Sequence, residues 1–295
     1  MAVVHEGDLQ AGGSHYDLLI GLHARHSSKA LLQFRSRYPE RLTVVALTGT
    51  DIYGDLSPTR KRQPRLAIRS LDETDRILLL QPLMRRRLRA AWKAKSSVVM
   101  MDAQPKGNAS RSAPAQRGAL RACVVGHMRY EKDPLRAAMA VRDLQEGSGI
   151  KVTHAGQALN DSFQRRADRE HAGNPNWHWR GSLSRKQVDR LMESSDLLIN
   201  SSRSEGAPNV LFEAIGFRLP VLVTKIDGHV GVLGKGYPGY FSLGDTKALQ
   251  KLLVRCHQDG GFYRRLVSCV DQLAVKYAAG KEQRSLIAAI RAAKR

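Results

Sequence analysis

The stretch Ser202–Val223, SRSEGAPNVLFEAIGFRLPVLV, decides the fold of the second half of this 295-residue chain. Its pattern predicts a turn, a helix over residues 207–218 and a buried strand from Leu219. Pro208 suits the first turn of that helix, where its missing N–H costs nothing. The helix would bury Val210, Leu211, Ala214 and Ile215. Because the strand-like run DLLINSSRSEG comes just before, we expect a strand–helix–strand unit of a parallel sheet.

The same alternation extends outward in both directions. Apolar runs such as YDLLIGLH, RLTVVALTG, DRILLLQP and SSVVMM alternate with helical patterns in the first half of the chain, including LMRRRLRAAWKAK over residues 83–95. The segment 102–118, DAQPKGNASRSAPAQRG, has no apolar periodicity and is expected to be a linker. The sequence therefore predicts an α/β protein with two Rossmann-like lobes, over residues 1–117 and 118–275, and a C-terminal helix over residues 276–295.

The composition, with 42% hydrophobic and 25% charged residues, is that of a folded protein. Three cysteines, Cys123, Cys256 and Cys269, form no close pair and are expected to be free thiols. The N-terminus lacks the pattern of a signal peptide, and no run of 18 apolar residues occurs. We therefore expect a cytoplasmic location and no transmembrane segment.

The formal net charge of +21 is concentrated in part between residues 60 and 95. That segment carries twelve Lys or Arg residues against three acids. No aromatic residues alternate with these charges as base stacking requires, so we expect no specific nucleic acid partner. A solvated basic surface is favoured, and weak association with an anionic surface stays open.

The turn before the predicted helix is a candidate anion site. Free N–H groups and the positive end of the helix dipole, at Asn209 and Val210, favour a diphosphate. Glu213 lies one turn further on and can accept from two ribose hydroxyls, while Glu205 precedes the turn and can face another part of the ligand. The alternative is that Glu205 decorates a loop and Glu213 is a surface helix residue.

A second candidate loop is VVGHMRYEKDP, where a strand is expected to end at Gly126. Arg129 and Lys132 then follow on a loop before a proline-initiated helix. Glycine lets the backbone approach a phosphate, and two cations can neutralise a leaving diphosphate. Loop cations are more often simply solvated, but both candidate loops belong to one lobe. Neither lobe has G-x-G-x-x-G or a P-loop lysine, which weakens dehydrogenase and NTPase hypotheses.

Together, G-x-x-R-x-x-K-D-P after a strand and E-x7-E around a Gly-Ala-Pro-Asn turn resemble the nucleotide-sugar half of a GT-B glycosyltransferase. The segments LHARHS, LTGTDIY, DRILLLQP, GHMRYEKDP and GVLGKGYPGYF are similar to a narrower group, which includes the selenosugar synthase of selenoneine biosynthesis. That synthase joins selenophosphate to the sugar of a UDP-sugar. The resemblance covers nearly the whole chain.

The resemblance implies roles for particular residues. On the donor side, Arg129 and Lys132 would contact the UDP diphosphate, with Gly126 keeping the loop close and Asn209 and Val210 offering backbone amides. Glu213 would hold the ribose and Glu205 would face the sugar. The loop Gly181-Ser182-Leu183 would border the uracil.

In the other lobe, the acceptor side would be lined by His23, Arg25 and the turn Thr48-Gly49-Thr50-Asp51. His23 is also a candidate catalytic residue. A core or capping role for His23 is the alternative. The family usually begins with a strand and a glycine-rich loop that this sequence is expected to lack, a βα unit of about 30 residues. That departure puts part of the acceptor cleft in doubt.

The hypothesis is transfer of a sugar, glucose or N-acetylglucosamine, from a UDP-sugar to selenophosphate. The pocket around Glu205 and His229 would decide which sugar is used. No metal and no cofactor are expected, because cations and a helix end would neutralise the diphosphate and no D-x-D cluster occurs. The alternatives are a hydroxyl acceptor on a lipid or oligosaccharide, and a truncated, inactive homologue that binds nucleotides or polyanions.

Overall fold

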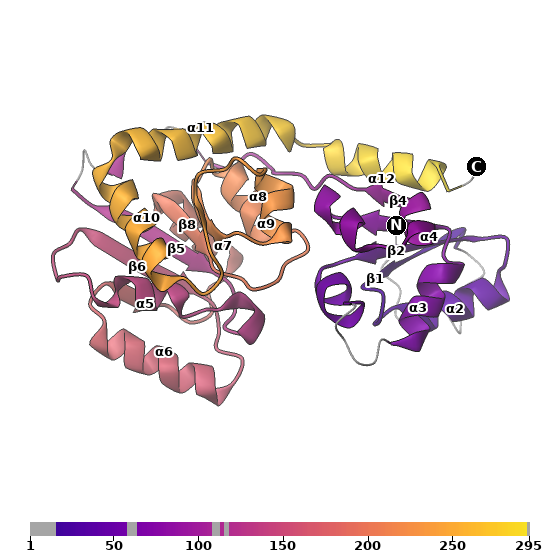
Figure 1. Cartoon of the computed structure of the whole chain (residues 1–295), viewed down its shortest axis with the longest axis horizontal. Coiled ribbons are helices and arrows are strands. Elements are labelled where there is room, and N and C mark those ends of the chain that lie inside the picture. Colours follow the sequence, from indigo (N-terminus) through magenta and orange to yellow (C-terminus); the bar gives the residue numbers. More distant parts are fainter. Residues whose placement is uncertain (1–15, 58–63, 108–112, 115–117, 294–295) are drawn as a thin grey trace. The chain divides into compact units, whose positions relative to one another are not determined.

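The computed structural model describes residues 16–57, 64–107, 113–114 and 118–293. It divides into two compact units, each built on a parallel sheet (Figure 1). Unit 1 comprises residues 1–101, 205–207 and 280–295, and unit 2 comprises residues 102–204 and 208–279. The prediction of an α/β protein with two Rossmann-like parallel-sheet lobes is confirmed.

Unit 1 contains a four-stranded parallel sheet in the order β1-β2-β3-β4. Its strands are β1 (Leu18–Leu22), β2 (Leu42–Leu47), β3 (Arg76–Leu79) and β4 (Ser96–Val98). Its helical elements are α2 (Ser28–Arg37), the π-helical turn η2 (Asp51–Asp55), α3 (Arg65–Glu73), the 3-10 helix η3 (Pro82–Arg87), α4 (Ala90–Ala94) and α12 (Lys281–Arg291). The apolar runs of the sequence therefore form the four strands, of which β2 and β3 are the most buried.

The helix expected over residues 83–95 is divided into η3 and α4. Leu88 between them has an extended backbone, and the chain there buries Met84, Leu88 and Trp92. The arginines of the segment, Arg85, Arg86, Arg87 and Arg89, stay exposed. Because like charges four residues apart repel each other on a continuous helix, the cluster of arginines favours the break.

Helix α12 completes the core of unit 1, although it lies at the other end of the sequence. Ala289 is 3% exposed and packs with Val44, Ala46 and Leu78, and Leu286 lies against the same cluster. Figure 1 shows α12, in yellow, beside β4. The expected C-terminal helix therefore belongs to the core of the N-terminal sheet.

Unit 2 contains a six-stranded parallel sheet in the order β10-β9-β8-β5-β6-β7. Its strands are β5 (Leu120–Val125), β6 (Ile150–Ala155), β7 (Trp177–Trp179), β8 (Leu197–Asn200), β9 (Val221–Thr224) and β10 (Tyr240–Phe241). The chain runs outward through β5, β6 and β7, then returns to add β8, β9 and β10 on the other side of β5. This is the doubly wound order of a Rossmann fold, and its direction reverses between β5 and β8.

The helical elements of unit 2 connect these strands and cover the sheet (Figure 1). They are the 3-10 turn η5 (Tyr130–Lys132), α5 (Arg136–Arg142), α6 (Asp161–Gly173), α7 (Arg185–Ser194), α8 (Asn209–Gly216), α9 (Asp227–Leu233), α10 (Thr246–Gln258) and α11 (Gly260–Lys276). Helix α8 is shorter than expected. It ends where Arg218 takes a left-handed conformation (φ 52°) and the Leu219 N–H donates to the Ala214 carbonyl at 2.8 Å.

The described part of the expected linker packs against unit 2. The Ala103 N–H donates to the Tyr277 carbonyl at 2.7 Å, and the Lys106 N–H donates to the Gly216 carbonyl at 2.9 Å. The Lys106 ammonium also lies 2.9 Å from the Asp189 carboxylate. The division between the units therefore falls at residues 101 and 102, before the boundary expected at residue 117.

Candidate functional site

The candidate donor site lies where the strand order of unit 2 reverses. In a doubly wound sheet, ligands bind outside the carboxyl ends of the strands at this point, because the loops after the two central strands separate there. The loop after β5 carries Gly126, Arg129 and Lys132, and the loop after β8 leads into α8. Residues 205–207 of the second loop, which include Glu205, group with unit 1. The fold thus brings both sequence-predicted loops to one place.

Direct hydrogen bonds join these two loops. The Ser201 hydroxyl donates to the carbonyl oxygens of Lys132 and Asp133 at 3.2 and 2.9 Å. The Arg203 N–H donates to the Glu131 carbonyl at 2.7 Å, and its guanidinium donates to the Asp133 carboxylate at 3.2 Å. Asp133 also has a left-handed backbone (φ 44°), which turns the chain into α5. The backbone around Lys132 is therefore held by these bonds from the loop after β8.

The two predicted diphosphate cations differ in exposure. Arg129 is exposed, with an extended backbone, and Lys132 is half-buried at the end of η5. Across the switch point, Pro208 is the N-cap of α8, and no side chain of the described residues caps that helix start. Asn209, the first helical residue, is exposed and Val210 is half-buried. Within the described residues the start of α8 therefore lacks a side-chain cap, which is the condition under which its backbone amides can bind an anion.

Glu213 lies on α8 and is already held by a cation. Its side chain is 20% exposed, and its Oε1 accepts from the Arg185 guanidinium at 2.6 Å. This hydrogen bond raises the pKa of Arg185. Arg185 is the first residue of α7, directly after the loop Gly181-Ser182-Leu183 expected beside the uracil. Sequence reasoning missed Arg185, because it lies 28 positions before Glu213 along the chain.

Three glycines continue the site along the carboxyl ends of the neighbouring strands β5, β6 and β7. The Gly126 N–H donates to the Ala155 carbonyl at 2.9 Å, and the Gly156 N–H donates to the Gly181 carbonyl at 2.7 Å. A Cβ atom on Gly156 would lie 1.9 Å from the Gly126 oxygen, whereas one on Gly126 or Gly181 would meet no atom within 4 Å. The backbone at Gly156 is therefore in close contact with the Gly126 carbonyl, whereas there is space for a side chain at Gly126 and Gly181.

A buried histidine supports the Gly126 turn from within the sheet. His154 on β6 is fully buried, and its Nε2 lies 3.0 Å from the Gly126 carbonyl oxygen. Since that oxygen can only accept, Nε2 carries the proton. Burial lowers the pKa of His154 to about 4, although the hydrogen bond to Gly126 opposes the shift. His154 is therefore neutral near pH 7.

The residues expected on the acceptor side gather in unit 1 after β1 and β2. His23 has a left-handed backbone (φ 70°), and its Nε2 lies 3.1 Å from the Thr50 hydroxyl. Its Nδ1 accepts from the backbone N–H groups of Arg25 and His26 at 3.3 and 3.4 Å. Nε2 therefore carries the proton of the neutral ring. Burial lowers the pKa of His23, so the neutral form is favoured.

Arg25 and Asp51 have partners within the same unit. The Arg25 guanidinium forms an ion pair with Asp55 at 2.9 Å. Asp51 has no exposed surface and accepts from the backbone N–H groups of Ala24, Thr48, Gly49 and Ile52 at 2.9 to 3.2 Å. Its carboxylate thus ties the loop after β1 to the loop after β2. Asp51 thus holds the two loops together from a buried position, while Thr50 next to it is exposed to solvent.

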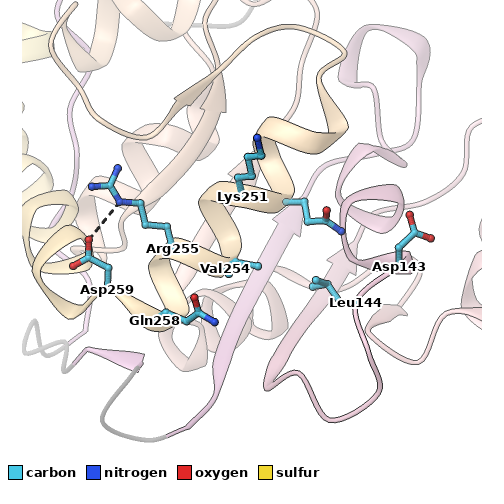
Figure 2. Close-up of a pocket in the computed structure, with 8 residues that line it drawn as sticks. Asp143, Leu144, Lys251, Val254, Arg255, Gln258 and Asp259 are labelled. Atoms are coloured by element: carbon cyan, nitrogen blue, oxygen red, sulfur yellow. Dashed lines mark hydrogen bonds and ion pairs between the residues drawn. The ribbon is translucent and has the colours of Figure 1, made fainter.

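A separate hollow of about 530 Å³ lies between the end of α5 and α10 (Figure 2). It is lined by Asp143, Leu144, Gln250, Lys251, Val254, Arg255, Gln258 and Asp259. Helix α5 runs back from the carboxyl end of β5, so its own C-terminus lies at the opposite edge of the sheet. Two acids and two cations line the hollow, and Arg255 already bonds Asp259 at 3.4 Å. Its position and balanced charge separate it from the donor site.

Comparison with known proteins identifies the family and the fold of this chain. The family model of glycosyl transferases group 1 matches residues 107–267, which include both loops of the switch point. The chain therefore belongs to the glycosyl transferases group 1 family, and its two parallel-sheet units are those of the GT-B fold. No curated protein matches the sequence significantly.

Solved structures with the same fold are distant in sequence. Anabaena Alr3699/HepE in complex with UDP and glucose has a TM-score of 0.78 at 15% identity, covering 97% of this chain and 81% of that one. The lipopolysaccharide outer core galactosyltransferase WaaB has a TM-score of 0.70 at 14% identity, covering 97% and 78%. Sucrose-phosphate synthase from Thermosynechococcus elongatus has a TM-score of 0.74 at 16% identity, covering 96% and 77%.

Among the residues that the structure describes, no group of three or more His, Cys, Asp or Glu side chains is placed to hold a metal ion. None of the described helices combines the length and apolar character that crossing a bilayer requires.

Proposed function

We propose that this chain transfers a glycosyl group from a UDP-sugar to a small anionic acceptor, with selenophosphate as the acceptor to test first. The observation that carries the donor half is the pairing of Arg129 and Lys132 with the uncapped start of α8 across the strand-order switch. Such a pairing of cations and backbone amides suits a diphosphate. The complexes of Anabaena HepE with UDP and with UDP-glucose support the same donor class.

In the proposed reaction, the acceptor attacks the anomeric carbon and the bond from that carbon to the β-phosphate oxygen breaks. UDP leaves with the electron pair, and the acceptor's proton passes to solvent. Arg129 and Lys132 stabilise the charge that develops on the diphosphate. Because these cations and the helix start do that work, no metal ion is needed, and we expect EDTA to leave the rate unchanged.

The acceptor half rests on the sequence resemblance and on the state of His23. An anionic chalcogen is a strong nucleophile and needs little general-base help. The Nδ1 of His23 accepts from two backbone N–H groups and its protonated Nε2 faces the Thr50 hydroxyl, so the ring has no lone pair left to act as a base. A hydroxyl acceptor would need a base instead, and this arrangement does not favour one.

The test is mass spectrometry of the purified chain with UDP-glucose or UDP-N-acetylglucosamine and selenophosphate. We expect a selenium-containing sugar together with UDP. Lys132→Ala should lower kcat/KM about 100-fold, which corresponds to about 3 kcal/mol of lost transition-state stabilisation. Lys247→Ala, which alters an exposed lysine on α10, is the matched control and should leave the rate unchanged.

The outcomes separate the two halves of the proposal. UDP binding without a selenium product would keep the donor and reject the acceptor. No binding of UDP or of either UDP-sugar would reject the donor as well. Full activity of Lys132→Ala would reject the role given to that residue.

A further inference from the structure

The bond between Arg185 and Glu213 joins two helices that begin beside the candidate donor site. Arg185 is fixed at the start of α7 by a capping box, in which the Ser184 hydroxyl accepts from the Gln187 N–H at 3.4 Å and the Gln187 side chain accepts from the Ser184 N–H at 2.9 Å. Its Nη1 then reaches Glu213 Oε1 at 2.6 Å. The capping box therefore fixes the backbone from which the Arg185 side chain, itself 58% exposed, reaches Glu213.

A network behind the pair restricts the guanidinium further. Arg185 Nε lies 3.3 Å from Asp189 Oδ1, one turn along α7. Asp189 also holds the Lys106 ammonium at 2.9 Å, and the Lys106 N–H is bonded to the Gly216 carbonyl at the end of α8. The two ends of the network lie on α7 and α8, so it fixes these helices relative to each other. An isolated surface ion pair would lack this support.

The bond leaves Glu213 with one carboxylate oxygen free. Oε1 is used by Arg185, and among the described residues no hydrogen bond reaches Oε2. The Glu213 side chain as a whole is 20% exposed, so the carboxylate is not fully enclosed by protein. A carboxylate oxygen has two acceptor positions, which suit two neighbouring hydroxyl groups. Arg185 also neutralises a carboxylate that lies in the C-terminal half of a short helix, where the helix dipole disfavours it.

We propose that Arg185 is a positioning residue for nucleotide recognition: it holds Glu213 so that the free oxygen meets the ribose hydroxyls of the donor. The inference rests on the proposed function, since it takes a uridine nucleotide as the ligand. If the inference holds, the protein's preference for a ribose over a 2′-deoxyribose depends on the Arg185–Glu213 pair and not on Glu213 alone. Arg185 itself touches only the protein.

The experiment measures binding of UDP and of 2′-deoxy-UDP by isothermal titration calorimetry. The proteins are the wild type, Arg185→Met, Glu213→Ala and the double variant. We expect Arg185→Met to weaken UDP binding about tenfold and 2′-deoxy-UDP binding less than twofold, so the preference for ribose largely disappears. In the Glu213→Ala background, Arg185→Met should have no further effect on UDP.

Two controls separate positioning from loss of fold. Arg190→Met removes an exposed arginine from the same helix and should leave both affinities unchanged. Arg185→Lys keeps the charge but loses the planar fork, and we expect a loss of UDP affinity between those of the wild type and Arg185→Met. Circular dichroism of each variant checks that the helices remain.

Several results would overturn the inference in distinguishable ways. Equal weakening of UDP and 2′-deoxy-UDP in Arg185→Met would show that Arg185 acts elsewhere on the nucleotide. A full effect of Arg185→Met without Glu213 would break the link between the two residues. A wild type that binds UDP without preferring ribose would reject only the inference, whereas one that binds no UDP would reject the proposed function too.

Discussion

Single residues in this chain act mainly by fixing the backbone of the loops around the candidate sites. Asp51 has no exposed surface and holds four backbone N–H groups from two loops of unit 1. His154 does comparable work in unit 2 with a single bond to the Gly126 carbonyl. Charge-assisted bonds to backbone amides are stronger than neutral ones, so the acid can organise more of the chain than the neutral histidine.

The buried His154 predicts a pH dependence of stability. Its pKa is about 4 in the folded chain, against an ordinary value of 6.5. Between these values the unfolded chain binds a proton that the folded chain does not, so stability falls as the pH is lowered through this window. We expect a loss of about 2 to 3 kcal/mol in the free energy of unfolding of unit 2 between pH 7 and pH 4.5.

Urea unfolding at the two pH values measures this loss, and His154→Gln gives the comparison. Glutamine can still donate a hydrogen bond but does not titrate in this range. The pH dependence of the variant should therefore be smaller than that of the wild type by about the amount given above. An identical pH dependence in both proteins would contradict the role of His154.

At the scale of elements, the carboxyl ends of β5, β6 and β7 depend on a close backbone contact. A Cβ on Gly156 would lie 1.9 Å from the Gly126 oxygen, and the φ of Gly156 is 155°. Backbone cannot give way as a flexible side chain does, so Gly156→Ala must separate the ends of β5 and β6. We expect a loss of about 3 kcal/mol in the free energy of unfolding, with weaker UDP binding.

Gly147→Ala is the matched control for this change. Gly147 also has a positive φ, of 87°, but a Cβ there meets no atom within 4 Å. It should cost only about 1 kcal/mol, the usual penalty of a left-handed alanine, and leave UDP binding unchanged. Thermal unfolding and calorimetry measure both variants. Equal losses in the two would mean that strain in φ, and not the contact with Gly126, is responsible.

The elements also explain what the sequence could and could not reveal. Strands such as Val221–Thr224 were predictable because they are apolar on both faces, as parallel sheets require. The break at Leu88 was not, since the apolar spacing of residues 83–95 also fits one helix. The loop positions of Lys132 and Glu205 followed from the strand pattern, whereas the pairing of Arg185 with Glu213 depends on how α7 and α8 pack.

At the scale of the whole molecule, the last helix of the sequence, α12, packs against the sheet of unit 1 and completes its hydrophobic core. Residues 280–295 belong to unit 1, whereas α11 just before them belongs to unit 2. Two contacts fix α12 in place: the Met100 N–H donates to the Ser285 hydroxyl at 3.0 Å, and Arg76 donates to the Ala292 carbonyl. Unit 1 therefore cannot complete its core until the rest of the chain has been made.

This dependence predicts that a charge in α12 destabilises the N-terminal unit. Ala289 is 3% exposed within the cluster of Val44, Ala46 and Leu78, so Ala289→Glu would bury an unpaired carboxylate. Ala288→Glu places the same residue on the exposed side of the helix and is the control. We expect Ala289→Glu to lower the stability of unit 1 by about 3 kcal/mol or more, and Ala288→Glu by less than about 0.5 kcal/mol.

The tryptophans allow each unit to be followed separately. Trp92 lies in unit 1, while Trp177 and Trp179 lie in unit 2. In a Trp177→Phe/Trp179→Phe background, urea unfolding followed by Trp92 fluorescence reports unit 1. Its midpoint should shift to lower urea in Ala289→Glu and stay in place in Ala288→Glu. Equal midpoints in the two variants would mean that α12 is not needed for the core of unit 1, because a carboxylate cannot enter a packed apolar cluster without cost.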